Sequence, residues 1–204
     1  MSARNLKAAA LISGRGRTVA SLVRSIECEG IPVELDLVVA HDESLEGVRR
    51  CRELGIRVEV VPGPPGARTS DRLDEILVEH GTDLLCLCGY LRRFRIGSHW
   101  RDRVMNIHPA LLPEFGGRGM YGDHVHRAVL EAGRTRTGCT VHWVDEEYDH
   151  GGHIVQKTCP VEPDDTLESL AERVFALECE AYPEALKSVV DELVGRVPAR
   201  MDQA

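Results

Sequence analysis

Residues 6–28, LKAAALISGRGRTVASLVRSIEC, decide the fold of this chain. Residues 6–12 form a nearly continuous apolar run of strand length, as in a strand that is covered on both faces. A glycine-rich turn follows at residues 13–18, and residues 19–28 place apolar side chains three and four apart, as an amphipathic helix does. A strand, a tight turn and a helix in this order predict the first unit of an α/β sheet.

The same alternation continues along the first half of the chain. Strands are predicted at residues 35–40, 58–61, 83–88 and 103–107, and further helices at 45–54 and 70–79. The second half predicts a helix at 124–132, a late strand pair at 138–144 and 153–160, and a long helix at 165–187 that Asp164 or Asp165 caps. We therefore expect an α/β fold with an open, mostly parallel twisted sheet, helices on both faces, a late strand pair and a long C-terminal helix.

Length and charge restrict the class of protein. The 204 residues suit a single domain, which we place at residues 1–195 with a tail at 196–204. A net charge of −8 and a pI near 5.6 argue against binding to nucleic acid or to an acidic membrane surface. Seven cysteines without a Cys-x-x-Cys pair favour reduced thiols and a cytoplasmic location, and no apolar run is long enough for a signal or membrane helix. We expect small-molecule partners and a monomer or homodimer.

The turn at residues 13–18, SGRGRT, is the first candidate binding site. Backbone N–H groups at the start of a helix, with glycines and two arginines beside them, can hold a phosphate. The segment lacks the Lys-Ser/Thr ending of a nucleoside-triphosphate loop and the third glycine of a dinucleotide fingerprint. An ordinary tight turn between strand and helix fits this segment equally well.

Asn106, His108 and Asp149 are the candidate catalytic residues. Asn106 and His108 are two apart at the end of a predicted strand, so their side chains leave the same face. The carboxyl ends of strands in open α/β sheets are where ligands bind. An amide, an imidazole and a carboxylate can together stabilise an oxyanion and transfer a proton. Alternatively, Asn106 and His108 are satisfied by nearby backbone groups, and Asp149 is a turn residue.

Two further features lie near these residues in the sequence. The glycine-rich segment 116–122, GGRGMYG, predicts a mobile loop beside the site and carries Arg118. His124, His126, His150 and His153 could suggest a metal site. No carboxylate is spaced to complete such a ligand set, so we expect no metal.

Six motifs occur in the order known from one enzyme family. They are ISGRG at 12–16, GYLR at 89–92, NIHPALLP at 106–113, HVHR at 124–127, GCTVH at 138–142 and DHGG at 149–152. From about residue 6 to residue 187 the chain resembles the phosphoribosylglycinamide formyltransferases, a folate-dependent family of purine synthesis with a Rossmann-like fold. Superfamily members that formylate methionyl-tRNA or hydrolyse the folate carry an added domain, for which 204 residues leave no room.

The resemblance implies an activity and a set of contacts. The enzyme would move the formyl group of 10-formyltetrahydrofolate to the amine of N1-(5-phospho-D-ribosyl)glycinamide, without a metal. Asn106 and His108 would stabilise the tetrahedral oxyanion, and Asp149 would favour the protonated form of His108 and assist proton transfer. The remaining implied contacts are Gly14, Arg15, Gly16, Arg17, Thr18 and Glu178 for the ribonucleotide, Leu91, Arg92, Arg93, Phe94, Val144, Asp145 and Glu146 for folate, and Arg118 and His124 beside the site or in a lid.

The chain departs from the best-known members in three places. Arg15 and Arg17 replace uncharged Asn and Ser, Phe175 occupies a place where a polar nucleotide contact is familiar, and segment 114–123 is longer. Three alternatives therefore stay open: hydrolysis of the same folate, transfer to another amine, and a non-enzymatic folate or ribonucleotide sensor. A matched acid and oxyanion donor set counts against the sensor.

Overall fold

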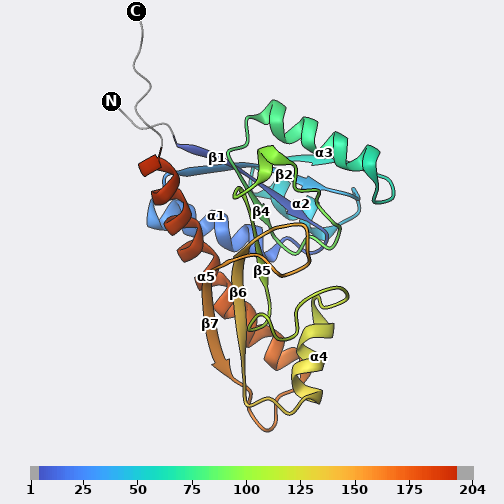
Figure 1. The fold of residues 1–204 in the computed structure, drawn as a ribbon, viewed down its shortest axis with the longest axis vertical. Helices are drawn as coiled ribbons and strands as arrows, with labels where there is room; N and C mark the ends of the chain where they lie inside the picture. The colour runs from blue at the N-terminus through green and yellow to red at the C-terminus, as the bar shows by residue number, and fades with distance from the viewer. Residues whose placement is uncertain (1–4, 197–204) are drawn as a thin grey trace, which may run out of the picture.

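A computed structural model describes residues 5–196 of the chain (Figure 1). Seven strands form one sheet in the order β3-β2-β1-β4-β5-β6-β7. The elements are β1 (Leu6–Ile12), α1 (Arg17–Glu29), β2 (Val33–Ala40), α2 (Glu46–Glu53), β3 (Arg57–Val60), α3 (Ala67–His80), β4 (Leu84–Leu87), the short 3-10 helix η1 (Ser98–Trp100), β5 (Val104–His108), α4 (Asp123–Glu131), β6 (Arg136–Trp143), β7 (His153–Pro160) and α5 (Leu167–Arg196).

The predicted α/β fold is confirmed. Strands β1 to β5 pair in parallel, whereas β6 pairs antiparallel with β5 and β7 antiparallel with β6. Strands β1 and β7 have the predicted bounds. Figure 1 shows the long β6–β7 pair extending away from the parallel strands, with α4 and α5 beside it.

Two predictions about the final helix were wrong. Helix α5 starts at Leu167 and continues to Arg196, beyond the predicted end at residue 187. Thr166 caps it, because the Thr166 hydroxyl accepts a hydrogen bond from the Ser169 N–H at 3.2 Å. The carboxylate of Asp165 is occupied by Arg173 and so does not serve as the cap. Residues 197–204 of the predicted tail lie outside the described residues.

Two apolar cores cover the two faces of the sheet. Along β1, Ala8, Ala10 and Ile12 contribute to a cluster that includes residues of α1, α2, α4 and α5. Ala9 and Leu11 contribute to a second cluster on the opposite face, which is covered by α3 and the segment around η1. This alternation follows from the two-residue period of a strand. It explains why residues 8–12 of β1 are all apolar and buried.

Tyr182 connects α5 to the middle of the sheet. Its buried hydroxyl lies 3.1 Å from the carbonyl oxygens of Leu87, the last residue of β4, and Met105 in β5. A buried hydroxyl needs such a partner, because leaving it unpaired costs about 1–3 kcal/mol. The contact therefore fixes α5 against the two strands whose carboxyl ends carry the candidate site.

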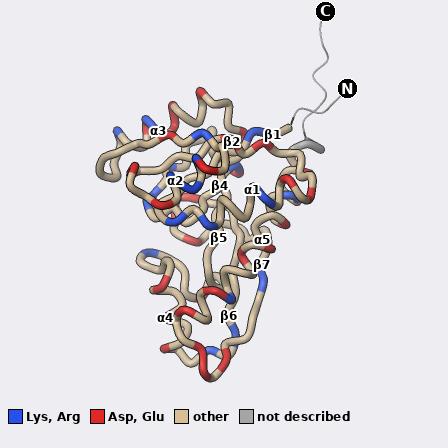
Figure 2. Tube along the Cα trace, turned by 180° about the vertical axis from the view of Figure 1, so that it is seen from behind, with Lys and Arg blue, Asp and Glu red and all other residues tan. Residues whose placement is uncertain are grey.

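Charges of both signs are distributed over the surface. Figure 2 shows Lys and Arg interspersed with Asp and Glu along the chain. All seven cysteines are free thiols in the structure. Within residues 5–196, no helix is long and apolar enough to cross a membrane.

Candidate active site

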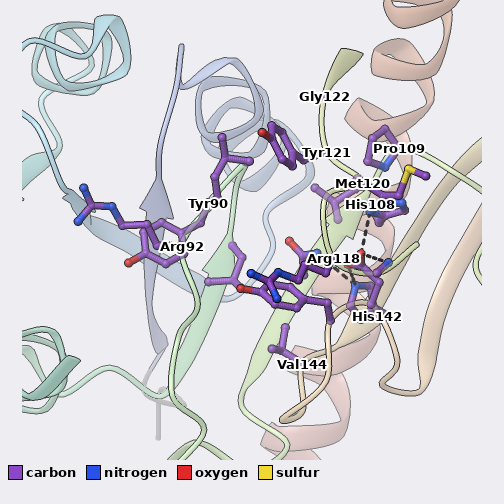
Figure 3. Close-up of a pocket in the computed structure, with 18 of the residues that line it drawn as sticks. Tyr90, Arg92, His108, Pro109, Arg118, Met120, Tyr121, Gly122, His142 and Val144 are labelled. Carbon is purple, nitrogen blue, oxygen red and sulfur yellow. Dashed lines mark hydrogen bonds and ion pairs between the residues drawn. The ribbon is translucent and has the colours of Figure 1, made fainter. Parts of the chain in front are cut away.

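A cavity of about 550 Å³ opens at the carboxyl ends of β4 and β5 (Figure 3). Its lining includes Asn106, His108 and Asp149, so the three candidate catalytic residues meet in one place. Asn106 and His108 leave the same face of β5, as their spacing predicts. Asp149 comes from the loop between β6 and β7.

His142 completes this cluster and is absent from the set chosen from the sequence. Asn106 and His142 are direct cross-strand partners in the β5–β6 pair. The His142 Nδ1 donates to the Trp143 carbonyl at 2.7 Å, so its Nε2 is free to accept from the Asn106 amide at 3.2 Å. One of the two amide N–H bonds of Asn106 is thereby used, and the other remains for a ligand in the cavity.

His108 is buried, and both of its ring nitrogens face protein atoms. Its Nε2 donates to the Phe115 carbonyl at 2.8 Å, and its Nδ1 lies 3.5 Å from the Asp149 Oδ2. Burial lowers the pKa of His108, and the charge of Asp149 and the bond to Phe115 only partly oppose this. Asp149 does favour the protonated form of His108, as expected, but the loss of hydration outweighs this charge, so the pKa of the imidazole lies below its usual value.

The Asp149 carboxylate lies between the two imidazoles. Its Oδ1 is 3.6 Å from the His142 Nε2, and its Oδ2 accepts the Gly117 N–H at 2.9 Å. Burial alone raises the pKa of Asp149, but His142, His108 and the Gly117 N–H together lower it below the usual value. Asp149 has a φ of +55°, a left-handed conformation that Asp tolerates better than most residues. The turn thus presents an ionised carboxylate to the site.

Thr140 and Gln156 hold the turn that follows β5. The Thr140 hydroxyl donates to the Ala110 carbonyl at 2.7 Å and accepts from the Leu112 N–H at 3.1 Å. The Gln156 amide donates to the same hydroxyl at 2.9 Å. Thr140 pairs with His108 across the β5–β6 ladder, so this buried network supports the strand end that carries His108. Neither residue was among the predicted site residues.

The glycine-rich loop predicted beside the site borders the cavity. Arg118, Met120 and Tyr121 all line it (Figure 3). His124 does not, and its ring instead packs edge-on against Tyr121 with centroids 5.0 Å apart. His126, one helical half-turn further along, lines the cavity in its place.

His126 is buried, and its Nδ1 has no hydrogen-bond partner among the described residues. Burial lowers its pKa, which the charge of Asp123 partly opposes. His126 therefore contributes a neutral imidazole to the cavity wall.

All seven residues assigned to folate line the cavity, namely Leu91, Arg92, Arg93, Phe94, Val144, Asp145 and Glu146. The two segments that carry them are joined by Arg93, which donates to the Glu146 carbonyl at 2.8 Å. Arg92 donates to the Gly63 carbonyl at 2.6 Å. Hydrogen bonds from these two arginine side chains to backbone carbonyls thus hold this part of the cavity wall in place.

Fewer of the residues assigned to the ribonucleotide line the cavity. Thr18 and Glu178 line it, together with Phe175, whereas Gly14, Arg15, Gly16 and Arg17 do not. Burial raises the pKa of Glu178 to about 8, with Arg17 opposing the rise. At neutral pH this carboxyl is mostly protonated and can donate a hydrogen bond.

The glycine-rich turn itself is fixed by Gly47 at the start of α2. The Gly47 N–H donates to the Gly14 carbonyl at 3.1 Å, and a Cβ on Gly47 would lie 2.5 Å from that oxygen. Gly16 has a φ of +68°, and a Cβ there would lie 2.9 Å from the Gly47 Cα. Both glycines are needed for this close backbone approach. Gly47 was not recognised from the sequence.

The described part of the chain, residues 5–196, contains no group of three or more His, Cys, Asp or Glu side chains arranged to hold a metal ion. The polar groups of the cavity are an amide, imidazoles, carboxyls and guanidinium groups. These groups can donate hydrogen bonds to an oxyanion and exchange a proton with a bound ligand.

Comparison with known proteins gives a consistent result. A family model described as formyl transferase matches residues 6–186. The chain is 34% identical to the chloroplastic phosphoribosylglycinamide formyltransferase of Arabidopsis thaliana over 94% of this chain and 68% of that protein. It is 39% identical to the trifunctional purine biosynthetic protein adenosine-3 of Gallus gallus, of which it spans only 19%.

Solved structures with the same fold carry related names. The glycinamide ribonucleotide transformylase 1 of Symbiobacterium toebii superposes with a TM-score of 0.85 at 32% identity, over 98% of this chain and 93% of that one. The phosphoribosylglycinamide formyltransferase of Anaplasma phagocytophilum gives a TM-score of 0.82 at 32% identity, over 92% and 88%.

Proposed function

The chain belongs to the formyl transferase family, and from this premise we propose that it transfers the formyl group of 10-formyltetrahydrofolate to the amine of N1-(5-phospho-D-ribosyl)glycinamide. The products are the N-formyl ribonucleotide and tetrahydrofolate, as a step of de novo purine (IMP) biosynthesis. The similarity to the Arabidopsis thaliana formyltransferase over 94% of this chain carries the proposal. The cavity with Asn106, His108 and Asp149 supports it.

The first chemical step is attack of the substrate amine on the formyl carbon. The formyl oxygen then becomes an oxyanion, and the amide N–H of Asn106 that His142 does not use donates to it. A positioned donor of this kind contributes about 3–4 kcal/mol to an acyl transfer. His108 supplies a second donor when its Nε2–H turns from the Phe115 carbonyl toward the oxyanion.

The second step moves one proton and breaks one bond. Attack on the formyl carbon leaves the amine nitrogen with one proton to lose, and the Asp149 carboxylate between the two imidazoles is its acceptor. Asp149 takes that proton through water and passes it to folate N10 as the bond from N10 to the formyl carbon breaks. No covalent enzyme intermediate and no metal are involved.

The substrates occupy opposite ends of the cavity in this proposal. Folate lies against segments 91–94 and 144–146, and the ribonucleotide lies toward Thr18 and Glu178. Arg118 covers the site from the 116–122 loop. We further propose that the enzyme works in the cytoplasm as a monomer or homodimer on small molecules, without nucleic acid or membrane. The acidic net charge of −8 supports that part.

Turnover of 10-formyltetrahydrofolate, followed by absorbance with and without the ribonucleotide, tests the function. We expect acceptor-dependent formation of tetrahydrofolate, and Asp149→Asn should abolish most of it while folate affinity changes only a few-fold. Acceptor-independent loss of the formyl group would identify a hydrolase instead. Tight folate binding without turnover would identify a sensor or a different acceptor.

A further inference from the structure

An ion pair lies beside two residues of the cavity lining, Thr18 and Phe175. Arg17, in the first turn of α1, donates two hydrogen bonds to the Glu172 carboxylate on α5, each at 2.6 Å. The guanidinium carbon lies over the Phe175 ring, 3.8 Å from its centroid. Phe175 and Thr18 line the cavity, but Arg17 does not. The charge of Arg17 therefore lies at the cavity edge and is neutralised there by Glu172.

This pairing occupies the part of Arg17 that is best suited to a phosphate. The two terminal nitrogens of a guanidinium form a planar fork that matches either a carboxylate or a phosphate. In Arg17 both of these nitrogens are bound to Glu172. A phosphate in the cavity can use the fork only after Glu172 has left it.

We propose that the phosphate of the acceptor displaces Glu172 from Arg17, and that Glu172 thereby sets the affinity and charge selectivity of the acceptor end. This inference rests on the function proposed above. Arg17 leaves the carboxylate, pairs with the phosphate and continues to lie on Phe175. Glu172 turns into solvent.

The exposure of the pair makes this exchange accessible. The side chains of Arg17 and Glu172 are 33% and 62% exposed, and ion pairs of this kind are weak. A phosphate dianion carries twice the charge of the carboxylate and offers more acceptor oxygens. Stacking on Phe175 restricts the guanidinium, so less side-chain freedom is lost when the partner changes.

Arg15 gives the released carboxylate a second cation nearby. The pKa of Glu172 is lowered mainly by its hydrogen bond with Arg17, and the charges of Arg17 and Arg15 add to this. Glu172 can therefore leave Arg17 without losing all favourable charge interactions. The two arginines that distinguish this turn then have different roles: Arg17 binds the phosphate, and Arg15 compensates the charge of the displaced carboxylate.

The exchange predicts selectivity for the charge of the ligand. An unphosphorylated acceptor, or one with a single weak negative charge, does not compete with Glu172 and finds no free cation.

The matched experiment is Glu172→Gln, which keeps the size of the side chain but removes its charge. Glu168→Gln, an exposed carboxylate one helical turn earlier on α5, controls for the general loss of one negative charge.

Two measurements on the full chain test the proposal. In Glu172→Gln, the Kd for inorganic phosphate, measured by calorimetry, should fall by about two- to fivefold, the size expected for an exposed ion pair. The KM for N1-(5-phospho-D-ribosyl)glycinamide should fall by the same factor. The same substitution in an Arg17→Ala background should have no such effect, because the competing cation is gone. Glu168→Gln should leave both values within about 1.5-fold, since exposed charges farther apart are largely screened.

Three results would overturn the exchange. They are an unchanged or weaker phosphate affinity in Glu172→Gln, an equal gain that persists in the Arg17→Ala background, and an equal gain in Glu168→Gln. Phosphate calorimetry does not depend on turnover. Failure of the exchange can therefore be told from failure of the proposed function, which shows as absent acceptor-dependent turnover in the unmodified protein.

Discussion

Replacing Asn106 by Ala tests the central element of the proposed chemistry. The amide makes one hydrogen bond to the His142 Nε2 at 3.2 Å, and its other N–H is available to the formyl oxyanion. Losing the N–H that faces the oxyanion removes a donor that acts mainly in the transition state, so kcat should fall by about 10²–10³-fold, or about 2.7–4 kcal/mol. Losing the hydrogen bond to His142 removes a partly buried neutral interaction. This should reduce the free energy of unfolding by only about 1 kcal/mol.

These two magnitudes separate catalysis from folding. Steady-state turnover of 10-formyltetrahydrofolate with saturating ribonucleotide gives kcat, fluorescence titration gives the folate dissociation constant, and thermal unfolding gives Tm. We expect a large loss in kcat, folate affinity within about threefold, and a Tm lower by about 2–4 °C for a chain of this size. A loss of folate affinity as large as the loss of rate would show that Asn106 binds the ground state, and the role proposed for its amide would be wrong.

Arg136→Ala is the matched control for this measurement. Arg136 lies on β6, the strand that carries His142, and its exposed side chain donates to the Thr158 hydroxyl at 2.8 Å. Removing it changes the same strand without touching the cavity. We expect kcat within about twofold of the unmodified protein, because exposed substitutions away from such sites usually have small effects. A rate loss comparable to that of Asn106→Ala would point to distortion of β6 as the common cause.

Three further predictions concern groups that surround the site. The pKa of Glu178 rises from 4.5 to about 8 on folding, so its contribution to stability is complete below pH 4.5 and is lost as pH rises toward 8. The Tm of Glu178→Gln relative to the unmodified protein should therefore increase across that window and then level off; a pH-independent difference would contradict the raised pKa. Gly47→Ala should raise the KM for the ribonucleotide and lower Tm, because its Cβ would lie 2.5 Å from the Gly14 carbonyl, and an unchanged KM would show that the turn does not contact the acceptor. Tyr182→Phe should reduce the free energy of unfolding by about 1–3 kcal/mol in urea denaturation, since two buried carbonyls lose their shared donor; no measurable change would mean that water replaces the hydroxyl.

The parallel half of the fold could be predicted because its signal is local. Each buried strand is a short apolar run, and each covering helix has its own amphipathic period. The bounds of β1 were predicted without error, and β2, β3, β4 and β5 each differ from the prediction by two residues or fewer at their N-terminal ends. The common face of Asn106 and His108 followed from the same two-residue period. Where a signal lies in neighbouring residues, sequence reasoning recovers it.

The antiparallel half of the site could not be predicted in the same way. His142 and Thr140 become site residues only because β6 pairs with β5 in one register, Asn106 with His142 and His108 with Thr140. A shift of one residue would turn both side chains to the other face of the sheet. Nothing in the local sequence of either strand specifies that register. The same holds for Gly47, whose contact with Gly14 depends on where α2 lies relative to the first turn.

The pKa of His108 shows a different kind of limit. The sequence identified its charged neighbour, Asp149, and that neighbour does raise the pKa of the imidazole. The net direction is opposite because the Phe115 to Gly117 backbone covers the ring, with the Phe115 carbonyl on Nε2 and the Gly117 N–H on Asp149. Burial disfavours the charged imidazole, whereas a carboxylate 3.5 Å away favours it, and the depth of burial decides between them. An identical Asn-x-His and Asp set on an open surface would therefore hold a histidine of higher pKa, so the covering loop decides in which direction the pKa of His108 departs from its usual value.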